Sequence, residues 1–324
     1  MLWGATTTGG GTFCSCGVVF GVDPSGTAPD KYYAFYGDAG GGKPNGNLID
    51  VEGKIYGTTE FGGGKNSNGV VFEIDPSNGN RRTIAKLSGT DGTDPKGGVV
   101  ALDGTLYGTA STGGAANKGT VFSVPIAGGN VHLLYSFKGK ADGESPAAGL
   151  VAYDGKLYGT TTGGGANYRG TVFEIAPDGA ERTVYSFKAV NDATFSQSAL
   201  VAADRTLYGV GWIGGANNVG AVFAVDPAAG SERVLYSFAS DQGYRPDGTL
   251  LVAGEWLYGT AQTGGEFRAG IVFAVKRSGG LDHYFSLEKS DGVQPGSGIT
   301  AGGDYFYGSA RYGGANDKGT LFTF

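Results

Sequence analysis

Side chains that could bind a ligand recur at fixed positions of a sequence motif that occurs seven times in this chain. The clearest copy reads LYGTTTGGGANYRGTVFEI, and the repeat aromatic is Trp3, Tyr56, Tyr107, Tyr158, Tyr208, Tyr258 or Tyr307. The residue four places after this aromatic is Thr7, Glu60, Ser111, Thr162, Trp212, Gln262 or Arg311. The residue five places after it is Thr8, Phe61, Thr112, Gly163, Ile213, Thr263 or Tyr312. Because the flanking Gly-Thr and Gly-Gly residues are almost constant, a fixed frame presents one changing pair in each copy.

The changing pair predicts a binding site. An aromatic platform beside polar and charged groups suits stacking and hydrogen bonding of a sugar or an aromatic ligand. We therefore expect ligand contacts from Glu60, Phe61, Trp212, Gln262, Arg311 and Tyr312, with Tyr168 and Arg268 further along their loops. The alternative is that exposed loop positions vary freely and that the tryptophan is incidental.

An aspartate also recurs, in the segment that joins one copy to the next. It is Asp38, Asp91, Asp142, Asp192, Asp241 or Asp291. Six carboxylates on one rim could hold a cation or repel an acidic partner. The alternative is that each aspartate forms a turn by accepting backbone N–H bonds. Every copy needs a turn and none needs a metal, so the regular spacing favours the turn, and we predict no metal site.

Residues typical of catalytic sites are sparse. His132 and His283 fall in expected outer strands at different registers, which argues against a general base. A glycoside hydrolase could pair Glu60 with one of the connecting aspartates, and a lyase could use Tyr or Arg. The sequence contains no Gly-x-Ser-x-Gly turn, histidine metal motif or phosphate loop. The catalytic residues therefore stay unknown, and we predict no cofactor.

Cys14 and Cys16 are the two cysteines, and they are too few for a disulfide framework. Two thiolates alone do not complete a zinc site either. We expect free or locally bridged thiols with no catalytic role.

The formal charge of −6 and only 24 Lys and Arg residues argue against a nucleic-acid partner. No apolar stretch is long enough to span a membrane. No signal peptide opens the chain, since Leu2 and Trp3 already belong to a repeat. The composition, poor in Lys and Met and rich in Gly, Thr, Ser and Asn, is typical of an exported bacterial protein. We expect a periplasmic or extracellular location.

The repeat predicts the fold. Successive repeat aromatics are 49 to 53 residues apart, a period typical of propellers and other repeat arrays. Such units stack on their neighbours, so we expect one domain over residues 1–324. Its units lie near residues 1–45, 46–97, 98–147, 148–197, 198–247, 248–297 and 298–324.

The fourth unit reads as four antiparallel strands, A to D. Strand A is expected at 149–153, strand B at 156–161, strand C at 171–175 and strand D at 182–187. Asp154-Gly155 is a two-residue hairpin signal between A and B. Three hairpins and one longer crossover per unit describe a propeller blade, with the repeat Tyr and the Phe of GTVF as its core.

The chain opens at strand B of the first unit and closes at strand C of the seventh. We predict an all-β propeller with seven blades. The alternative is six, with the two incomplete units merged into one composite blade.

The pattern DG-x-x-P-x-x-x-L, LYGTT-x-GG, GTVF and LYSF resembles the GloVer tandem-repeat proteins, which are bacterial and mostly exported. It is carried here by Asp142-Gly143, Pro146, Leu150, 157–160, Gly164-Gly165, 170–173 and 185–187. Trp3, the CSC insertion and 210–212 depart from the pattern. The resemblance implies a propeller-like domain, often at the cell surface, and it supplies no catalytic residues.

We therefore expect non-catalytic recognition at the cell surface or in the periplasm, with a carbohydrate or another surface protein as partner. The first alternative is a carbohydrate-active enzyme that uses the same face, with Glu60 and Arg311 as its first candidates. The second is a structural module that assembles through its incomplete end blades.

Overall fold

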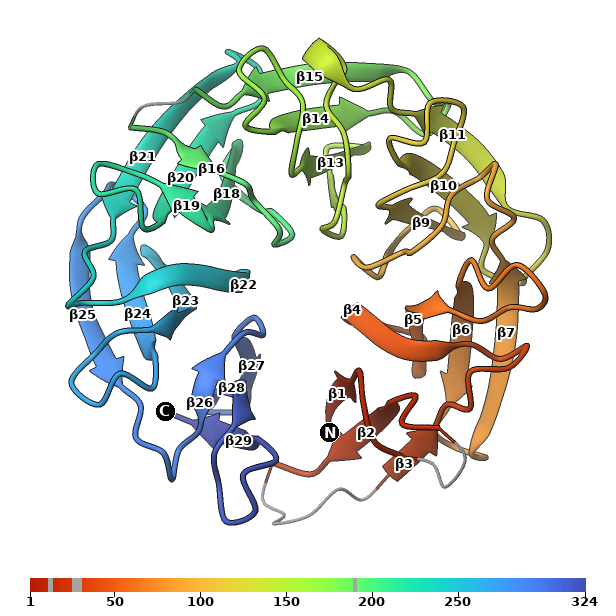
Figure 1. The fold of residues 1–324 in the computed structure, drawn as a ribbon, viewed down its shortest axis with the longest axis horizontal. Coiled ribbons are helices and arrows are strands. Elements are labelled where there is room, and N and C mark those ends of the chain that lie inside the picture. The colour runs from red at the N-terminus through yellow and green to blue at the C-terminus, as the bar shows by residue number, and fades with distance from the viewer. Residues whose placement is uncertain (11–13, 25–30, 189–190) are drawn as a thin grey trace. The chain divides into compact units, whose positions relative to one another are not determined.

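The computed structural model describes residues 1–10, 14–24, 31–188 and 191–324. These residues confirm the predicted all-β fold, since they form seven antiparallel sheets of three or four strands, the blades of a seven-bladed β-propeller (Figure 1). We number the blades in chain order. The chain divides into two compact units, Met1–Gly159 with Glu174–Arg182, and Thr160–Phe173 with Thr183–Phe324. Each unit is described by itself.

The first three blades lie in the first unit. Blade 1 contains β1 (Leu2–Thr6), β2 (Val18–Val22) and β3 (Lys31–Ala34). Blade 2 contains β4 (Gly42–Val51), β5 (Lys54–Phe61), β6 (Val70–Asp75) and β7 (Asn80–Lys86). Blade 3 contains β8 (Val99–Leu102), β9 (Thr105–Ala110), β10 (Thr120–Pro125) and β11 (His132–Ser136), and a 3-10 turn, η1 (Lys140–Asp142), follows it.

Blade 4 contains β12 (Val151–Tyr153), β13 (Lys156–Thr161), β14 (Thr171–Ile175) and β15 (Glu181–Ser186). The predicted strands B and C have these bounds, whereas strand A starts two residues later and strand D one residue earlier than expected. Asp154 and Gly155 have φ values of 50° and 71°, which are those of the expected tight hairpin turn.

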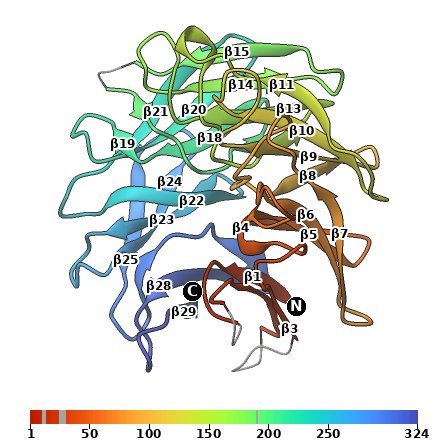
Figure 2. The same ribbon diagram turned by 45° about the vertical axis from the view of Figure 1, so that its right-hand side comes forward.

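The remaining blades lie in the second unit. Blade 5 contains β17 (Val201–Ala203), β18 (Thr206–Gly211), β20 (Ala221–Asp226) and β21 (Ser231–Ser237), beside a small ribbon of β16 (Ala193–Thr194) and β19 (Ile213–Gly214). Blade 6 contains β22 (Tyr244–Ala253), β23 (Trp256–Thr263), β24 (Ile271–Lys276) and β25 (Leu281–Ser286), side by side in chain order (Figures 1 and 2). Blade 7 contains β26 (Val293–Pro295), β27 (Thr300–Gly302), β28 (Tyr305–Tyr312) and β29 (Thr320–Thr323).

The first and last blades contain the strands that the repeat predicts for them. Blade 1 consists of strands B, C and D, in the order β1-β2-β3. In blade 7, β26 and β27 both pair with β28 as two pieces of strand A, and β29 is strand C.

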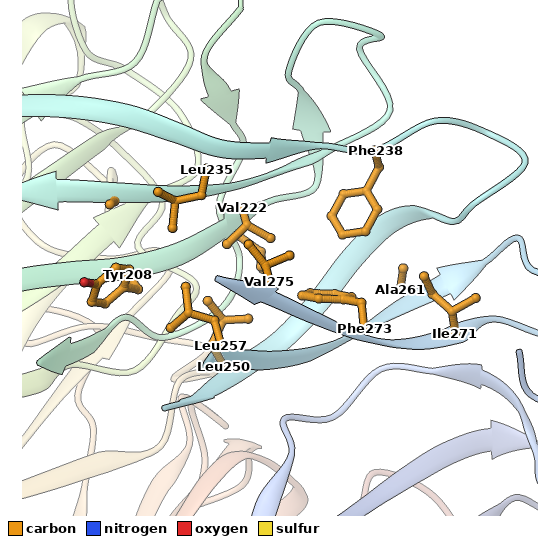
Figure 3. Packing of buried hydrophobic residues seen from close by; sticks show 12 residues of the cluster. Tyr208, Val222, Leu235, Phe238, Leu250, Leu257, Ala261, Ile271, Phe273 and Val275 are labelled. Carbon is orange, nitrogen blue, oxygen red and sulfur yellow. The ribbon is translucent and has the colours of Figure 1, made fainter. Parts of the chain in front are cut away.

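The repeated aromatics form the core between blades. Tyr208 and Phe223 are 4% and 0% exposed, which confirms a structural role for these two positions of the phrase. The rings of Phe238 and Phe273 meet edge to face at 5.0 Å, between strand D of blade 5 and strand C of blade 6 (Figure 3). Such pairs add to the stabilisation that burial of each ring already gives.

The constant glycine of LYGT has a packing reason. A Cβ atom on Gly209 would lie 2.6 Å from Cζ of Phe223 on the paired strand. Real Cβ atoms do not approach a ring carbon so closely, so a larger residue would displace the core phenylalanine.

A second constant feature fixes how one blade follows the next. The amide of Arg245 donates to the carbonyl of Val219 at 2.9 Å, and Pro246 packs on Gly220. A Cβ on Gly220 would lie 2.2 Å from Cδ of the proline. This contact places the start of strand A of blade 6 beside the loop after strand B of blade 5, where the changing pair lies.

Candidate functional site

The changing pair lies where strand B ends and the next loop begins. Glu60 and Phe61 end β5, Gln262 lies near the end of β23, and Arg311 and Tyr312 end β28. This loop and the crossover segment lie together, because the amides of Gly63, Gly114, Gly215 and Gly314 donate to carbonyls of the crossover. The two connections of a blade therefore share one face within each unit.

Two further variable positions flank the proline that starts strand A, and they were not predicted from the sequence. The residue before it is Lys43, Asp94, Ser145, Phe195, Arg245 or Gln294, and each of these has φ between 53° and 60°. The residue after it is Asn45, Lys96, Ala147, Gln197, Asp247 or Gly296. The repeats could have indicated these two positions. The proline is present in all copies but one, whereas the residues on both sides of it change from copy to copy.

In blade 2 these positions form what we call the blade 2 cluster: Lys43, Asn45 and Glu60. Asn45 donates to the Glu60 carboxylate at 2.8 Å, and Lys43 Nζ lies 4.0 Å from the other carboxylate oxygen. Phe61 packs against the core that contains Cys16 and lies under Lys43, 5.9 Å from its ammonium nitrogen. Phe61 is therefore partly a core residue as well as a candidate ligand contact.

In the second unit the same positions form the blade 6 cluster: Trp212, Arg245, Asp247, Gln262 and Arg311. The Asp247 carboxylate accepts a bond from Gln262 Nε2 at 2.8 Å, and Arg311 Nη2 lies 3.7 Å from the same oxygen. Its other oxygen accepts bonds from the amide of Gly248 at 2.9 Å and from the Ser198 hydroxyl at 3.4 Å. The structure thus brings two predicted residues, Gln262 and Arg311, onto one carboxylate.

Trp212 belongs to this cluster through Arg245. The guanidinium carbon of Arg245 lies 4.7 Å from the centre of the Trp212 ring and 6.0 Å from that of Tyr244. A cation over an indole face is attracted by the ring quadrupole. Trp212 is partly buried, whereas Arg245 is exposed.

Tyr168 and Arg268 share one turn position with Ser67, Asn117, Asn218 and Asp317, and all six have φ between 52° and 57°. Ser67, Asn117 and Asp317 accept a bond from the amide of the first loop glycine of their copy. Tyrosine and arginine cannot make this short bond, and bulky residues are strained in the left-handed region. Both side chains are exposed, and Tyr168 is 68% exposed.

The eight predicted contact residues are not all joined by direct interactions. Tyr312 is 52% exposed and, with Tyr168 and Arg268, makes no side-chain hydrogen bond or ion pair in the ranges that the structure describes. Glu60 and Phe61 lie in the first unit and the other six residues in the second. A single pocket mouth lined by all eight stays a prediction.

Five of the six aspartates in the crossovers between copies form turns. Asp91, Asp142, Asp192 and Asp291 each accept the amide of a residue three or four places earlier, and Asp38 accepts that of Gly40. Asp142 and Asp192 also accept the hydroxyls of Tyr135 and Tyr185, each at 2.6 Å. Among the described residues no group of three or more His, Cys, Asp and Glu side chains is arranged to hold a metal ion.

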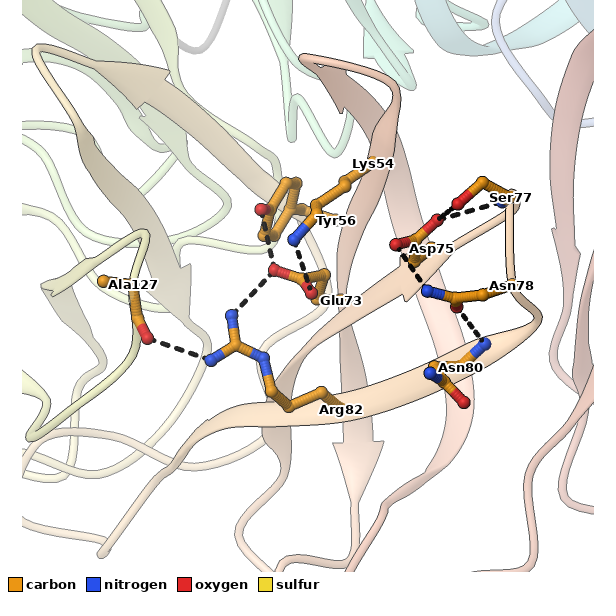
Figure 4. Close-up of polar contacts among 9 residues, drawn as sticks. All are labelled: Lys54, Tyr56, Glu73, Asp75, Ser77, Asn78, Asn80, Arg82 and Ala127. Carbon is orange, nitrogen blue, oxygen red and sulfur yellow. Dashed lines mark hydrogen bonds and ion pairs between the residues drawn. The ribbon is translucent and has the colours of Figure 1, made fainter.

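An ionic network surrounds the buried Glu73 on the blade 2 strands (Figure 4). Glu73 accepts bonds from Tyr56 at 2.8 Å, Arg82 at 2.8 Å and Lys54 at 3.3 Å. Burial opposes ionisation of Glu73, but these donors outweigh it and lower the pKa of its carboxyl group. Arg82 also donates to the carbonyl of Ala127 in blade 3, so the network ties two blades together.

Two other glutamates, each with one buried carboxyl oxygen, lie near an acidic residue. Oε1 of Glu181 and Oε1 of Glu232 are buried without a hydrogen-bond partner among the described residues. Burial and the nearby Asp142 raise the pKa of Glu181 to about 7. Burial and the nearby Asp192 raise the pKa of Glu232 to about 8.

The histidines and cysteines occupy structural positions. His132 and His283 lie exposed in the outer strands β11 and β25, as expected. Cys14 and Cys16 form a disulfide, so the bridged form is the one present. Among the residues that the structure describes, no helix has the length and apolar character that spanning a bilayer requires.

Fold and site together define a propeller whose constant frame carries variable side chains at the changing pair and on both sides of the proline that starts strand A. The chain belongs to the Gloeobacter/Verrucomicrobia repeat family, whose model matches residues 1–154 and 126–322. This membership confirms the resemblance seen in the repeat phrase. A search of curated proteins gives no match.

Solved structures with a similar fold have diverse descriptions. A putative 6-phosphogluconolactonase from Bacteroides uniformis has a TM-score of 0.61 at 18% identity, over 98% of this chain and 94% of its own. A PQQ-bound aldose sugar dehydrogenase from Streptomyces coelicolor has a TM-score of 0.54 at 12% identity, over 86% and 93%. A chain of a nidogen/laminin complex has a TM-score of 0.52 at 16% identity, over 91% and 96%. At these identities the likeness shows the fold alone.

Proposed function

We propose that this protein is a non-catalytic recognition propeller that works at the cell surface or in the periplasm and binds a carbohydrate or another surface protein. The proposal rests on one observation: some positions of the repeat are constant in all blades, and others carry a different side chain in each blade. Glycines, prolines and core aromatics recur because packing requires them, whereas the residues around the proline and after strand B change from blade to blade. Recognition surfaces are commonly built in this way, with variable side chains on a rigid scaffold.

Strain at two positions supports the same proposal. Tyr168 and Arg268 occupy a left-handed turn position where other copies carry residues suited to it. Exposed bulky side chains at such a position cost stability and cover no core, which is typical of residues kept for binding.

The Cys14–Cys16 disulfide supports an exported location, because disulfides persist mainly in oxidising compartments. The charge of −6 also supports a partner other than nucleic acid.

A glycan and protein array tests the proposed function, with the double variant Trp212→Ala/Arg311→Ala compared with the unchanged protein. The matched control is Trp256→Ala/Arg233→Ala. Trp256 begins β23, at the opposite end of that strand from Gln262, and Arg233 donates to the carbonyl of Ser278 near the same end. We expect binding to be lost only in the first variant. Equal binding by both variants would contradict the proposed site.

The second candidate is a carbohydrate-active enzyme, and the setting of Glu60 favours it. The Glu60 side chain is 20% exposed and is held by Asn45 and Lys43, as a positioned acid or base would be. Product formation from an oligosaccharide that disappears in Glu60→Gln would establish this candidate. Binding without turnover in the unchanged protein supports the recognition function.

A further inference from the structure

We propose that the blade 6 cluster binds a carboxylate-bearing sugar, with Trp212 against the sugar ring and Arg245 and Arg311 on the carboxylate. This inference rests on the proposed recognition function and names the chemical class of the ligand. All the residues that carry it lie in the second unit.

Blades 2 and 6 differ in how the charges at the same positions are compensated. In blade 2 the acid Glu60 lies 4.0 Å from the cation before the proline, Lys43. In blade 6 the position of Glu60 is taken by Gln262, and the acid is Asp247 instead. Both oxygens of Asp247 are occupied by donors other than Arg245. Blade 6 therefore presents an arginine that has no acidic partner among the described residues.

Arg245 is also held in an orientation that suits a ligand. Its backbone has a φ of 57° and is fixed by the amide bond to Val219 and by the following proline. Its guanidinium lies over the Trp212 ring. A guanidinium ordered in this way loses little further conformational entropy when it forms two parallel bonds to a carboxylate.

Arg311 supplies a second guanidinium, beside Asp247, which is two residues from Arg245 in the chain. Its ion pair with Asp247 is long, at 3.7 Å, and its side chain is 57% exposed. It lies along Gly296, where a Cβ atom would stand 3.0 Å from Arg311 Nε. A larger residue in place of Gly296 would crowd the Arg311 side chain in this orientation.

The ligand class follows from these groups. The planar fork of an arginine matches the two oxygens of a carboxylate, and indole faces stack on the apolar C–H face of a sugar. Gln262, whose amide nitrogen is bound to Asp247, can accept a bond from a sugar hydroxyl group through its side-chain oxygen. A uronic acid unit combines a ring, hydroxyl groups and a carboxylate, which are the three features that the cluster can contact.

The test is an array of uronate oligosaccharides, namely pectate, alginate and glucuronan fragments, each printed beside its carboxyl-reduced neutral form. We expect the unchanged protein to bind at least one acidic fragment at least tenfold more tightly than its reduced form. Binding should weaken between about 0.05 and 0.5 M NaCl, as screening of charge pairs requires. Arg245→Gln should lower the affinity at least tenfold, and Trp212→Ala should lower it too.

Two controls keep the outcome clear. Lys276→Gln removes a cation that lies over another indole, 4.9 Å from the centre of the Trp256 ring, and should leave uronate binding within twofold. The circular dichroism spectrum and melting temperature of each variant verify its fold. Arg245→Lys keeps the charge without the planar fork and should give an intermediate affinity. Binding of neutral sugars or proteins but of no uronate would overturn this inference and leave the recognition function standing. Binding of nothing on the combined glycan and protein arrays would overturn both.

Discussion

Glu232 offers the sharpest test of how the blades are held together. It lies on β21 and approaches the crossover turn of Asp192, whose carboxylate already accepts bonds from the Tyr185 hydroxyl and the Lys188 amide. The amide of Ala193 donates to the Glu232 carboxyl group, and its Oε1 is buried without a partner among the described residues. An ionised Glu232 would place two carboxylates together in a poorly solvated region.

The sign and size of the effect follow from linkage. Burial and Asp192 raise the pKa of Glu232 from 4.5 to about 8. Between these two values the folded protein holds a proton that the unfolded chain has released. The stability from this proton is therefore fully present below pH 4.5 and is lost as the pH rises towards 8. At about 1.4 kcal/mol per pH unit, the loss between pH 5 and 8 is on the order of 3 kcal/mol.

The assay compares Glu232→Gln with the unchanged protein by urea unfolding at pH 5, 6, 7 and 8. Glutamine keeps the shape of the protonated acid and does not titrate. We expect the free energy of unfolding of the variant, relative to the unchanged protein, to rise by about 3 kcal/mol from pH 5 to pH 8. Glu181→Gln should show the same trend, but it should level off above the pKa of about 7. Glu266→Gln, at an exposed side chain, is the matched control for the substitution itself.

A difference that stays constant within about 0.5 kcal/mol across this pH range would refute the reasoning. It would mean that Glu232 is ionised in the folded protein and finds a cation or water that compensates Asp192. Blade 2 shows how a cation compensates such an aspartate. Arg81 occupies the position of Glu232 there, and it is attracted by Asp38.

Three further predictions concern the network, the core and the loops. Glu73→Gln should cost about 1–2 kcal/mol in urea unfolding at pH 7, because charge-assisted bonds from Arg82 and Tyr56 are weakened. The lowered pKa of Glu73 means that this deficit should shrink as the pH falls below the ordinary value of 4.5, and a deficit that grows in acid would contradict the assignment. Phe223→Ala removes a fully buried ring and should cost about 3–5 kcal/mol in the same assay, against less than about 1 kcal/mol for an exposed site. Tyr168→Asn should raise the melting temperature, since asparagine is suited to a φ of 57°, and should weaken ligand binding; a lower melting temperature would show that Tyr168 is not strained.

The blades could be predicted from the sequence because most of their pairings are local. The hairpin at Asp154-Gly155 and the bounds of β13 and β14 follow from turn residues and alternation within about twenty residues. The roles of the repeat Tyr and the GTVF Phe followed as well, since large rings that recur at a fixed place are most simply explained as core.

The candidate site could be predicted only in part. The changing pair identified Gln262 and Arg311, but nothing local indicates that both reach Asp247, which lies 15 and 64 residues away. The stacking of Arg245 on Trp212 likewise depends on a left-handed backbone before a proline, a position where sequence patterns predict an extended residue. The buried glutamates were missed because Glu181 and Glu232 look like ordinary strand residues until the neighbouring blade is placed beside them.

The class of fold and the variable positions of the repeat follow from the sequence, because short-range turns and burial recur with the period of the repeat. The sequence left six blades as an alternative to the predicted seven, and the separate sheets of the first and last units exclude it. Three outcomes depend on the folded structure: which variable side chains meet, which carboxyl groups keep a proton and which arginine lacks an acidic partner. They are set by distances and burial between neighbouring blades. Residues about fifty positions apart in the chain determine these distances, and a periodic pattern aligns such residues without showing how closely their side chains approach.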